Sequence, residues 1–525
     1  MNLTRSQMQD DLMYLCDLLV KSHPDPFWGA GGAVNFYRRV DDIYRALPDT
    51  LSVLKYLDRI RPVVASLRDG HTKIGIAETD KMGTSHLPVD FGILADGLYV
   101  DRVSAPEHLG LLGSRLGGVN GVPVEEIGAR VMARQGCDND MQVWCRIADA
   151  FYEPELWADL LQVDTCDHLV LGLDTAGGEH LSMRFNWTLN RAALTSSSTV
   201  PMPRLRSNQL GWGFLDPDQE VAILRIGSLM RYREAGEVWL QSGFTKPLEE
   251  WYAEVFPFTS TRPTTSELEK FLTDTPSATE VLQNCLVAMA QAHTSWLVVD
   301  VRESLGGNSA LADMLGLSLF GSEALGHLDA GYQVRRYSEL YRENYGKLPD
   351  DDFFPGGYDF REARHWQERM PQEAPAHDAL SWLDGVPTFQ KAWKDLPQCR
   401  PKVLVVTSAR TYSAGFDVVL TLRGLGARHV GVSSSQAPNC FIDVLRFRLP
   451  HSQISGVVSF KQSVALPQLD ADVRTLVPHH VLTYDKLRAF AFDPEASIRL
   501  ALTVIEDLDT GTLQRESGQV PGNGR

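Results

Sequence analysis

The pattern of apolar and polar positions divides the chain into three regions of different character. From residue 4 to about 67, apolar side chains recur at the three- and four-residue spacing of amphipathic helices. Between residues 73 and 190 the pattern changes to short strand-like runs, with helices near 123–133 and 142–152. From Val221 onward, strand-like runs alternate with helical stretches. The pattern predicts a helical unit, a β-rich unit and a larger α/β unit.

The third region predicts a largely parallel sheet covered by helices. Two of its strand runs, 296–301 and 403–406, are apolar enough to be buried on both faces, and each leads toward a helical pattern. A segment of about 323–396, rich in aromatic, charged and Pro residues, interrupts this alternation. Such a long insertion is typical of a lid, of a segment that binds substrate, or of a contact between copies in a homo-oligomer.

Composition narrows the class of protein. The chain has 525 residues, 43% apolar and 22% charged, which is typical of a folded protein with more than one structural unit. Its formal charge of −17 argues against a nucleic-acid partner, because phosphate binding depends on clustered Lys and Arg. We expect no nucleic-acid partner.

No membrane contact, cofactor or metal is expected. No window of about 18 apolar residues suits a membrane-spanning helix, and the N-terminus lacks the pattern of a secretion signal. The seven Cys residues form no Cys-x-x-Cys pair, which fits a reducing compartment, so the expected location is cytoplasmic. The pair His479-His480 lacks further metal ligands, and Gly424 to Gly431 does not match a dinucleotide fingerprint.

Ser413 is the candidate nucleophile. It follows the apolar run that begins at Lys402, at the point where small and hydroxylated residues precede a new helical pattern. A strand fixes the position of such a residue, and the unpaired N–H groups of the following helix can face a developing negative charge. Two other segments, 67–72 and 299–308, contain motifs that support a catalytic interpretation of this serine.

These three segments carry a resemblance to a known family. The motifs are Asp69-Gly-His-Thr72, Asp300-Val-Arg-Glu-Ser-Leu-Gly-Gly307 and Thr411-Tyr-Ser-Ala414, in this order. They resemble the motifs of the tail-specific, or C-terminal-processing, serine peptidases, and especially their tricorn-core-like and chlamydial-protease-like branch. The resemblance extends from about His23 to Leu502.

The resemblance implies a role for each matching residue. Ser413 is expected to be the nucleophile, with His71 as its general base, and the N–H groups of Ala414 and of Gly306 or Gly307 form the oxyanion hole. The carboxylate that supports the histidine corresponds to Asp472, six residues before Pro478, with Asp470 as a rival. The lysine-dependent branch of the family is disfavoured, because the nearest downstream lysine, Lys461, is 48 residues beyond Ser413.

The resemblance also implies a fold and a function. We expect an α/β protein with a helical N-terminal domain (1–75), a PDZ-like β-rich domain (76–200), a ClpP/crotonase-like core of mainly parallel strands (201–508) with a lid-like insertion at about 323–396, and a mobile tail (509–525). The implied function is cleavage of a peptide or protein substrate through an acyl-enzyme on Ser413.

Other interpretations stay open at this point. The same acyl-enzyme can be captured by an amine or hydroxyl, as in a transferase or cyclase. Ser304 and Phe416 depart from the family pattern, which is compatible with a non-catalytic ligand-binding protein of the same fold. Thr411-x-Ser413-x-Gly415 is also close to the Gly-x-Ser-x-Gly elbow of α/β-hydrolases, with Asp472 and His479 or His480 as partners, but little chain remains for that fold.

Overall fold

The structure of the chain is a computed structural model that describes residues 2–75, 85–188, 198–205, 210–243, 245–257, 261–322, 324, 331–346, 348, 357–359, 386–397 and 399–512. Contacts divide the chain into two compact units. The first unit comprises Met1–Ser197, Gly331–Glu368 and Ser435–Leu476, and the second comprises Ser198–Ala330, Arg369–Ser434 and Val477–Arg525. Among the described residues, none of the helices has both the length and the apolar character that a membrane span requires.

The first unit begins with helices, as the apolar spacing predicts. They are α1 (Arg5–Ser22), α2 (Ala33–Ala46) and α3 (Val53–Ala65), and the short strands β1 (Asn2–Thr4) and β2 (Thr50–Ser52) pair beside them. A capping box between Thr4 and Gln7 fixes the start of α1. The buried faces of the helices share one apolar core with residues of a β-hairpin from near the end of the chain, such as Leu445 and Val458.

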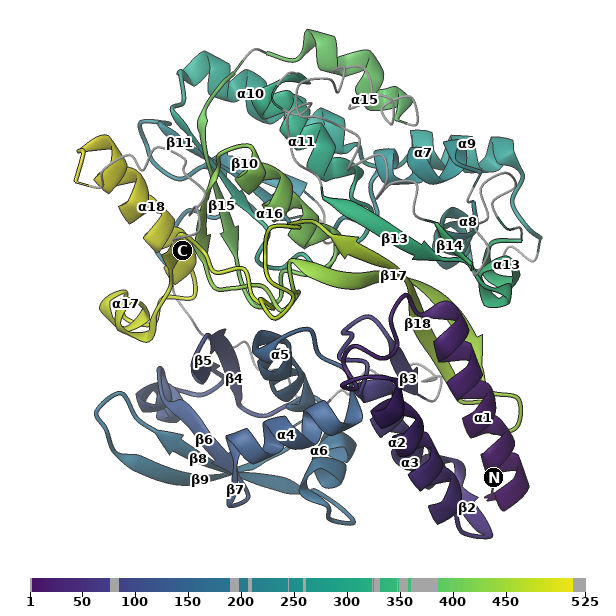
Figure 1. Ribbon diagram of the computed structural model, residues 1–525. Coiled ribbons are helices and arrows are strands. Elements are labelled where there is room, and N and C mark those ends of the chain that lie inside the picture. The colour runs from purple at the N-terminus through teal and green to yellow at the C-terminus, as the bar shows by residue number, and fades with distance from the viewer. Residues whose placement is uncertain are drawn as a thin grey trace, which may run out of the picture. The chain divides into compact units, whose positions relative to one another are not determined.

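That hairpin belongs to a sheet built from segments far apart in the sequence (Figure 1). It consists of β17 (Asn439–Arg448) and β18 (Ser455–Val464), and the sheet also contains β13 (Tyr332–Arg336), β14 (Tyr358–Asp359) and β3 (Lys73–Gly75). Strand β3 pairs antiparallel with the start of β18. This pairing fixes the position of the segment directly before β3, which contains His71. Helix α13 (Glu339–Tyr345) packs against β17.

A second sheet of the first unit confirms the strand-like runs between residues 89 and 186. Its order is β4 (Val89–Leu94), β5 (Gly97–Val103), β6 (Arg115–Val119), β8 (His168–Asp174) and β9 (His180–Asn186), with β7 (Val122–Pro123) paired to β6. The Asn120-Gly121 turn joins β6 to β7, and both of its residues have positive φ. The remaining elements are η1 (Pro106–Leu111), α4 (Val124–Arg134), α5 (Asp140–Ala150) and α6 (Pro154–Leu161).

The second unit contains the largely parallel sheet that the alternating pattern predicts. Its order is β10 (Leu210–Phe214), β11 (Val221–Ile226), β12 (Trp296–Asp300), β15 (Lys402–Thr407), β16 (Arg428–Gly431) and β19 (His480–Val481). Among the described residues of this sheet, β10 pairs antiparallel with β11, and the other neighbouring strands pair in parallel. Every residue of β12 is buried, as expected for a strand covered on both faces.

Helices pack around this sheet (Figure 1). Those that begin near the carboxyl ends of central strands are α11 (Ala310–Phe320) and α16 (Ala414–Gly424), which pack against each other. Helix α18 (Ala496–Asp509) packs on β15 and β16. The others are α7 (Arg233–Gln241), α8 (Lys246–Val255), α9 (Thr265–Thr273), α10 (Ala278–Ala292), α15 (Pro387–Ala392), η3 (Trp393–Asp395) and α17 (Tyr484–Ala489).

The expected insertion at about 323–396 is described only in part. Its described pieces include β13 and α13, which join the first unit, and α15, which packs on α7 and α10 of the second. Most of the remaining insertion lies outside the described residues. Of the expected tail (509–525), Asp509 is the last residue of α18, and residues 513–525 lie outside the described residues. The lid-like role of the insertion and the four-part domain division therefore stay predictions.

Candidate active site

Ser413 stands at the turn between β15 and α16. It is the N-cap of α16, with φ 52° and ψ −130°, a backbone conformation that non-glycine residues rarely adopt. Its carbonyl oxygen accepts hydrogen bonds from the N–H groups of Phe416 at 2.7 Å and Asp417 at 3.1 Å. Its side chain is only half-buried. Strained backbone of this kind persists only where the surrounding contacts hold it, which is common at functional sites.

The turn before Ser413 is tied to the segment that follows β12. The buried Thr411 hydroxyl donates to the carbonyl of Val301 at 2.9 Å, and the Ser408 hydroxyl donates to that of Arg302 at 2.5 Å. The Tyr412 N–H donates to the Ser304 carbonyl at 2.9 Å. These bonds fix the position of Ser413 relative to the Gly306-Gly307 pair.

Gly306 and Gly307 are in conformations that favour glycine. Their φ angles are +115° and +140°. A β-carbon at Gly306 would lie 2.5 Å from the Cβ of Ser413, and one at Gly307 would collide with the backbone of Leu229. The Leu229 N–H donates to the Gly306 carbonyl at 3.2 Å, which fixes the direction of this segment. The sequence motif therefore brings the backbone of Gly306 beside the candidate nucleophile.

The donors expected for an oxyanion hole are available. Within the described part of the chain, the N–H groups of Gly306, Gly307 and Ala414 have no hydrogen-bond acceptor. Ala414 is the first residue of α16, where the N–H groups of a helix are not used within the helix. Unpaired donors beside a serine hydroxyl are what stabilisation of a tetrahedral oxyanion requires.

A buried ion network supports this part of the second unit. Arg302 donates to Asp300 through Nε at 2.8 Å and through Nη2 at 2.9 Å, and Nη2 also donates to Glu495 at 2.6 Å. Burial alone would raise the pKa of Asp300, but Arg302 holds it below its ordinary value. Arg225 also approaches Asp300, with its Nε 3.4 Å from Oδ2. The network anchors the end of β12, from which the Gly306-Gly307 segment departs.

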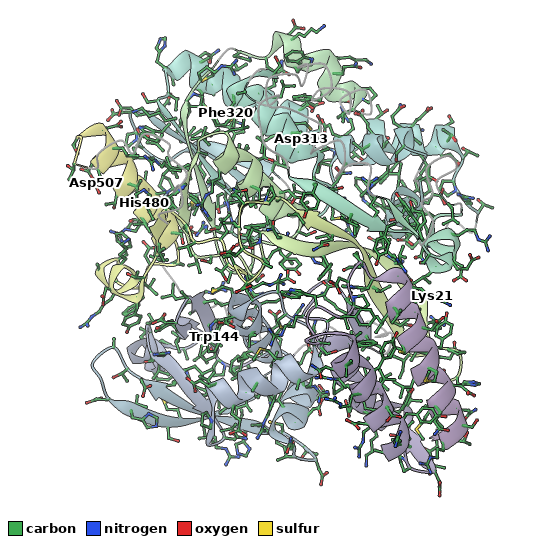
Figure 2. All side chains as sticks on the ribbon, in the orientation of Figure 1. Lys21, Trp144, Asp313, Phe320, His480 and Asp507 are labelled. Atoms are coloured by element: carbon green, nitrogen blue, oxygen red, sulfur yellow. The ribbon has the colours of Figure 1, made fainter. Side chains whose placement is uncertain are left out.

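Two acidic side chains lie on the helices that follow these loops. Asp313 is on α11, where Figure 2 labels it, and Asp417 is in the first turn of α16. Burial, and next the charge of Asp417, raise the pKa of Asp313 to about 7. The Ser309 hydroxyl donates to Asp417 at 2.5 Å.

His71 lies in the first unit, in the segment between α3 and β3. The side chain of Asp69 organises this segment: its Oδ1 accepts the His71 N–H at 2.8 Å, and its Oδ2 accepts the Thr72 hydroxyl and lies 3.2 Å from Nε2 of His23. Burial alone would raise the pKa of Asp69, but the hydrogen bond from His23 leads the effects that lower it to about 2. The Thr72 hydroxyl oxygen in turn accepts the Ser459 N–H of β18 at 3.0 Å.

Asp138 and Asp443 also lie in the electrostatic environment of His71. Asp138 accepts the N–H of Gly70 at 2.9 Å; burial raises its pKa, and the charge of His71 opposes this rise. Asp443 pairs with Lys461 at 3.0 Å. Partial desolvation would raise the pKa of Asp443, whose side chain is half-exposed, but Lys461 and, less strongly, His71 lower it. Neither carboxylate was predicted from the sequence, because only the fold brings residues so distant in sequence near His71.

Asp472 and Asp470 both lie in the exposed turn after β18, in the same unit as His71. Within the described residues neither carboxylate makes a hydrogen bond or ion pair. The assignment of Asp472 therefore stays a prediction.

His479 is in the second unit and accepts the N–H of His429 at Nδ1, at 2.9 Å. His480 belongs to β19 and is labelled in Figure 2.

A metal or disulfide explanation gains no support. No cluster of three or more His, Cys, Asp and Glu side chains suited to a metal ion occurs among the residues that the structure describes. The seven cysteines are free thiols.

The similarity of this chain to known proteins is in structure. No family model matches the sequence, and no curated protein matches it. Mature CPAF is similar in structure, with a TM-score of 0.57 and 12% identity over 98% of this chain and 99% of that chain. Mature CPAF complexed with lactacystin gives a TM-score of 0.55 and 13% identity over 97% and 99%.

A photosystem II D1 C-terminal processing protease is more distant, with a TM-score of 0.42 and 12% identity over 94% of this chain and 96% of that chain. At such low identity the likeness to CPAF shows the fold alone. The chain therefore has the fold of mature CPAF, and the resemblance to tail-specific serine peptidases that its motifs predict is confirmed at the level of the fold.

Proposed function

We propose that the chain is a serine peptidase of the tail-specific type, acting on peptide or protein substrates. The observation that carries this proposal is the close contact of Gly306 with Ser413, together with the unused N–H groups around it. A loop with only a structural role does not require a serine in a strained conformation beside two glycines with positive φ. An acyl-transfer site needs both, since the nucleophile must be exposed and the oxyanion must be stabilised.

The proposed reaction follows the chemistry of serine hydrolases. The Oγ of Ser413 attacks the scissile carbonyl carbon while His71 accepts the hydroxyl proton. The N–H groups of Gly306 or Gly307 and of Ala414 donate to the oxyanion. When the C–N bond breaks, His71 returns the proton to the leaving amine, and the acyl group stays on Ser413 as an ester. Water, activated by His71, then attacks the ester and releases the acid product.

The proposal keeps Asp472 as the carboxylate that supports His71, with Asp470 as its rival. It adds Asp138 and Asp443 as further candidates, since both carboxylates lie in the electrostatic environment of His71. Such a carboxylate orients the imidazole and stabilises the imidazolium that forms during the reaction.

We also propose that the fold contains a PDZ-like module and a ClpP/crotonase-like core. The sheet from β4 to β9, with its Asn120-Gly121 turn before α4, supports a PDZ-like module within 76–200. The parallel sheet of the second unit, with a helix after β12 and after β15, supports a ClpP/crotonase-like core within 201–508.

Active-site labelling tests the proposal. The purified chain is incubated with a fluorophosphonate probe, whose phosphorus is attacked by an activated serine with loss of fluoride, and the adduct is located by mass spectrometry. We expect one adduct on Ser413, and none with Ser413→Ala or His71→Ala. Ser182→Ala and His180→Ala are controls, because both residues are exposed on β9. Labelling that persists in Ser413→Ala would refute the assignment, and incubation with a peptide library separates a peptidase from other hydrolases.

A further inference from the structure

His23 is held in one orientation by contacts at both of its ring nitrogens and with the ring of Phe441. It is the first residue after α1, and its side chain is fully buried. Its ring lies against that of Phe441, with 4.3 Å between the centroids. The Asp25 N–H donates to Nδ1 of His23 at 3.1 Å. Because Nδ1 accepts this bond, the hydrogen of the neutral ring is on Nε2, which faces Oδ2 of Asp69 at 3.2 Å.

The loop that carries Asp25 is itself fixed. Oδ1 of Asp25 accepts the N–H groups of Phe27 at 3.0 Å and Trp28 at 3.1 Å. The Asp25 N–H is therefore held in a position that orients His23. This contact directs the Nε2–H bond of His23 toward Asp69.

Asp69 connects His23 to His71, the proposed general base, through hydrogen bonds. Its carboxylate is buried, and it accepts three hydrogen bonds, from His23, from the Thr72 hydroxyl and from the backbone N–H of His71. Two of the three donors belong to His71 and its neighbour. The orientation of the Asp69 carboxylate therefore determines where the backbone of His71 lies.

We propose that His23 is a positioning residue for the general base, which acts by donating from Nε2 to Asp69 and so fixing the carboxylate that holds the His71 backbone. The inference rests on the proposed function of His71. A displacement of about 1 Å in a catalytic group is enough to lower a rate by about 10²-fold. The lowered pKa of Asp69 agrees with an anion that accepts several hydrogen bonds.

Paired amide substitutions test this role. The side-chain nitrogen of glutamine reaches about as far as Nε2 of histidine, whereas that of asparagine reaches only as far as Nδ1. His23→Gln therefore keeps a donor toward Asp69, and His23→Asn and His23→Ala do not. We expect the second-order rate of fluorophosphonate labelling at Ser413 to fall about 10²-fold in His23→Asn and His23→Ala. His23→Gln should recover most of the wild-type rate.

A destabilised control separates positioning from loss of folding. Tyr56 is buried in the same helical core and donates from its hydroxyl to the Met8 carbonyl at 2.7 Å, without contacting Asp69. Tyr56→Phe should lower the melting temperature and leave the labelling rate near that of the wild type. If Tyr56→Phe slows labelling as much as His23→Asn, or if His23→Gln is as slow as His23→Asn, the positioning role is refuted.

The same measurements distinguish a failure of the positioning role of His23 from a failure of the proposed function. If the wild-type chain labels at Ser413 and all three His23 variants label equally fast, the positioning inference fails and the proposed function stands. If the folded wild-type chain does not label at all, the proposed function fails and the role of His23 fails with it.

Discussion

Gly306 and Ser413 are in such close contact that Gly306 has no room for a side chain. A β-carbon at Gly306 would lie 2.5 Å from the Cβ of Ser413 and 3.1 Å from its Oγ. Gly306 also has φ +115°, which a residue with a side chain rarely adopts. The sequence requirement for glycine at this position therefore follows from the position of the nucleophile.

Gly306→Ala is expected to slow fluorophosphonate labelling by about 10²-fold or more, since displacing one oxyanion donor costs about 10²–10³ in rate. Gly426→Ala is the matched control, because Gly426 has φ +96° and no atoms within 4 Å of a new β-carbon. Both variants carry similar backbone strain of about 1–2 kcal/mol, but only the first crowds Ser413. Equal labelling rates in the two variants would contradict the assigned role of Gly306.

Arg302 and Asp300 give a prediction about stability. Removal of one partner from a buried ion pair leaves an uncompensated charge, so Arg302→Met is expected to lower the free energy of unfolding by about 3–5 kcal/mol. Arg262 also binds a carboxylate through two nitrogens, at 2.8 Å each to Glu249, but its side chain is 76% exposed. Arg262→Met should leave stability nearly unchanged. Urea unfolding of both variants measures the difference, and equal losses would refute the distinction.

The sequence was most informative where the structure is local. The apolar run of β15, followed by small residues and then α16, predicts both elements and the turn at Ser413 between them. The two positive-φ glycines after β12 were also identified from their motif, because glycine is needed where backbone approaches a reacting group. Periodicity and turn chemistry decide these features within about a dozen residues, so sequence analysis can detect them.

The sequence did not reveal contacts that depend on the tertiary fold. The hairpin of β17 and β18, which pairs with β3 and so holds the His71 segment, was missed. Asp69 was quoted only as part of a motif, although its carboxylate is the hub of that segment. The His and Thr residues that follow Asp69 in the sequence indicated local hydrogen-bond partners for its carboxylate. Its other partner, His23, lies 46 residues away, and the Ser459 N–H that donates to Thr72 lies 387 residues from it. No local pattern encodes such pairings.

Asp472 gives a prediction about the supporting carboxylate. If it orients His71, Asp472→Asn should slow labelling of Ser413 by about 10²–10⁴-fold, as loss of such a carboxylate does in serine proteases. Asp470→Asn is the matched control, since Asp470 is exposed in the same turn. A slow Asp470→Asn variant would favour the rival. Wild-type rates in both would move the assignment to Asp138 or Asp443, which the same substitution then tests.

A side chain at Gly136 is expected to displace the segment that contains His71. A β-carbon at Gly136 would lie 2.5 Å from the carbonyl oxygen of Asp69 and 2.9 Å from its nitrogen. Gly136→Ala is therefore expected to displace Asp69 and slow labelling by about 10-fold to 10²-fold. Gly110→Ala is the control, because a β-carbon there meets no atoms within 4 Å. Probe kinetics at neutral pH compare the two, and an unaffected Gly136→Ala variant would show that the segment can shift without consequence.

The buried environment of His429 leads us to expect that the stability of the second unit depends on pH. Its side chain is fully buried, and its Nδ1 lies 3.2 Å from Nη1 of Arg423, which can only donate. Its Nε2 lies 2.8 Å from the Thr407 hydroxyl, which donates its own hydrogen to the Val432 carbonyl at 2.6 Å. The neutral ring with its hydrogen on Nε2 satisfies both contacts. Burial, then Arg423 and His479, lower the pKa of His429 to about 3.

Because this pKa is lowered, the unfolded chain binds a proton at His429 below about pH 6.5 and the folded chain does not. The contribution to stability is complete above pH 6.5 and is lost as the pH falls toward 3, by about 3 kcal/mol between pH 6.5 and pH 4. His429→Gln removes this titration, so its free energy of unfolding should fall less steeply with acid than that of the wild type. Urea unfolding at several pH values, followed by tryptophan fluorescence, measures the slopes. A wild-type slope in His429→Gln would contradict the buried neutral imidazole.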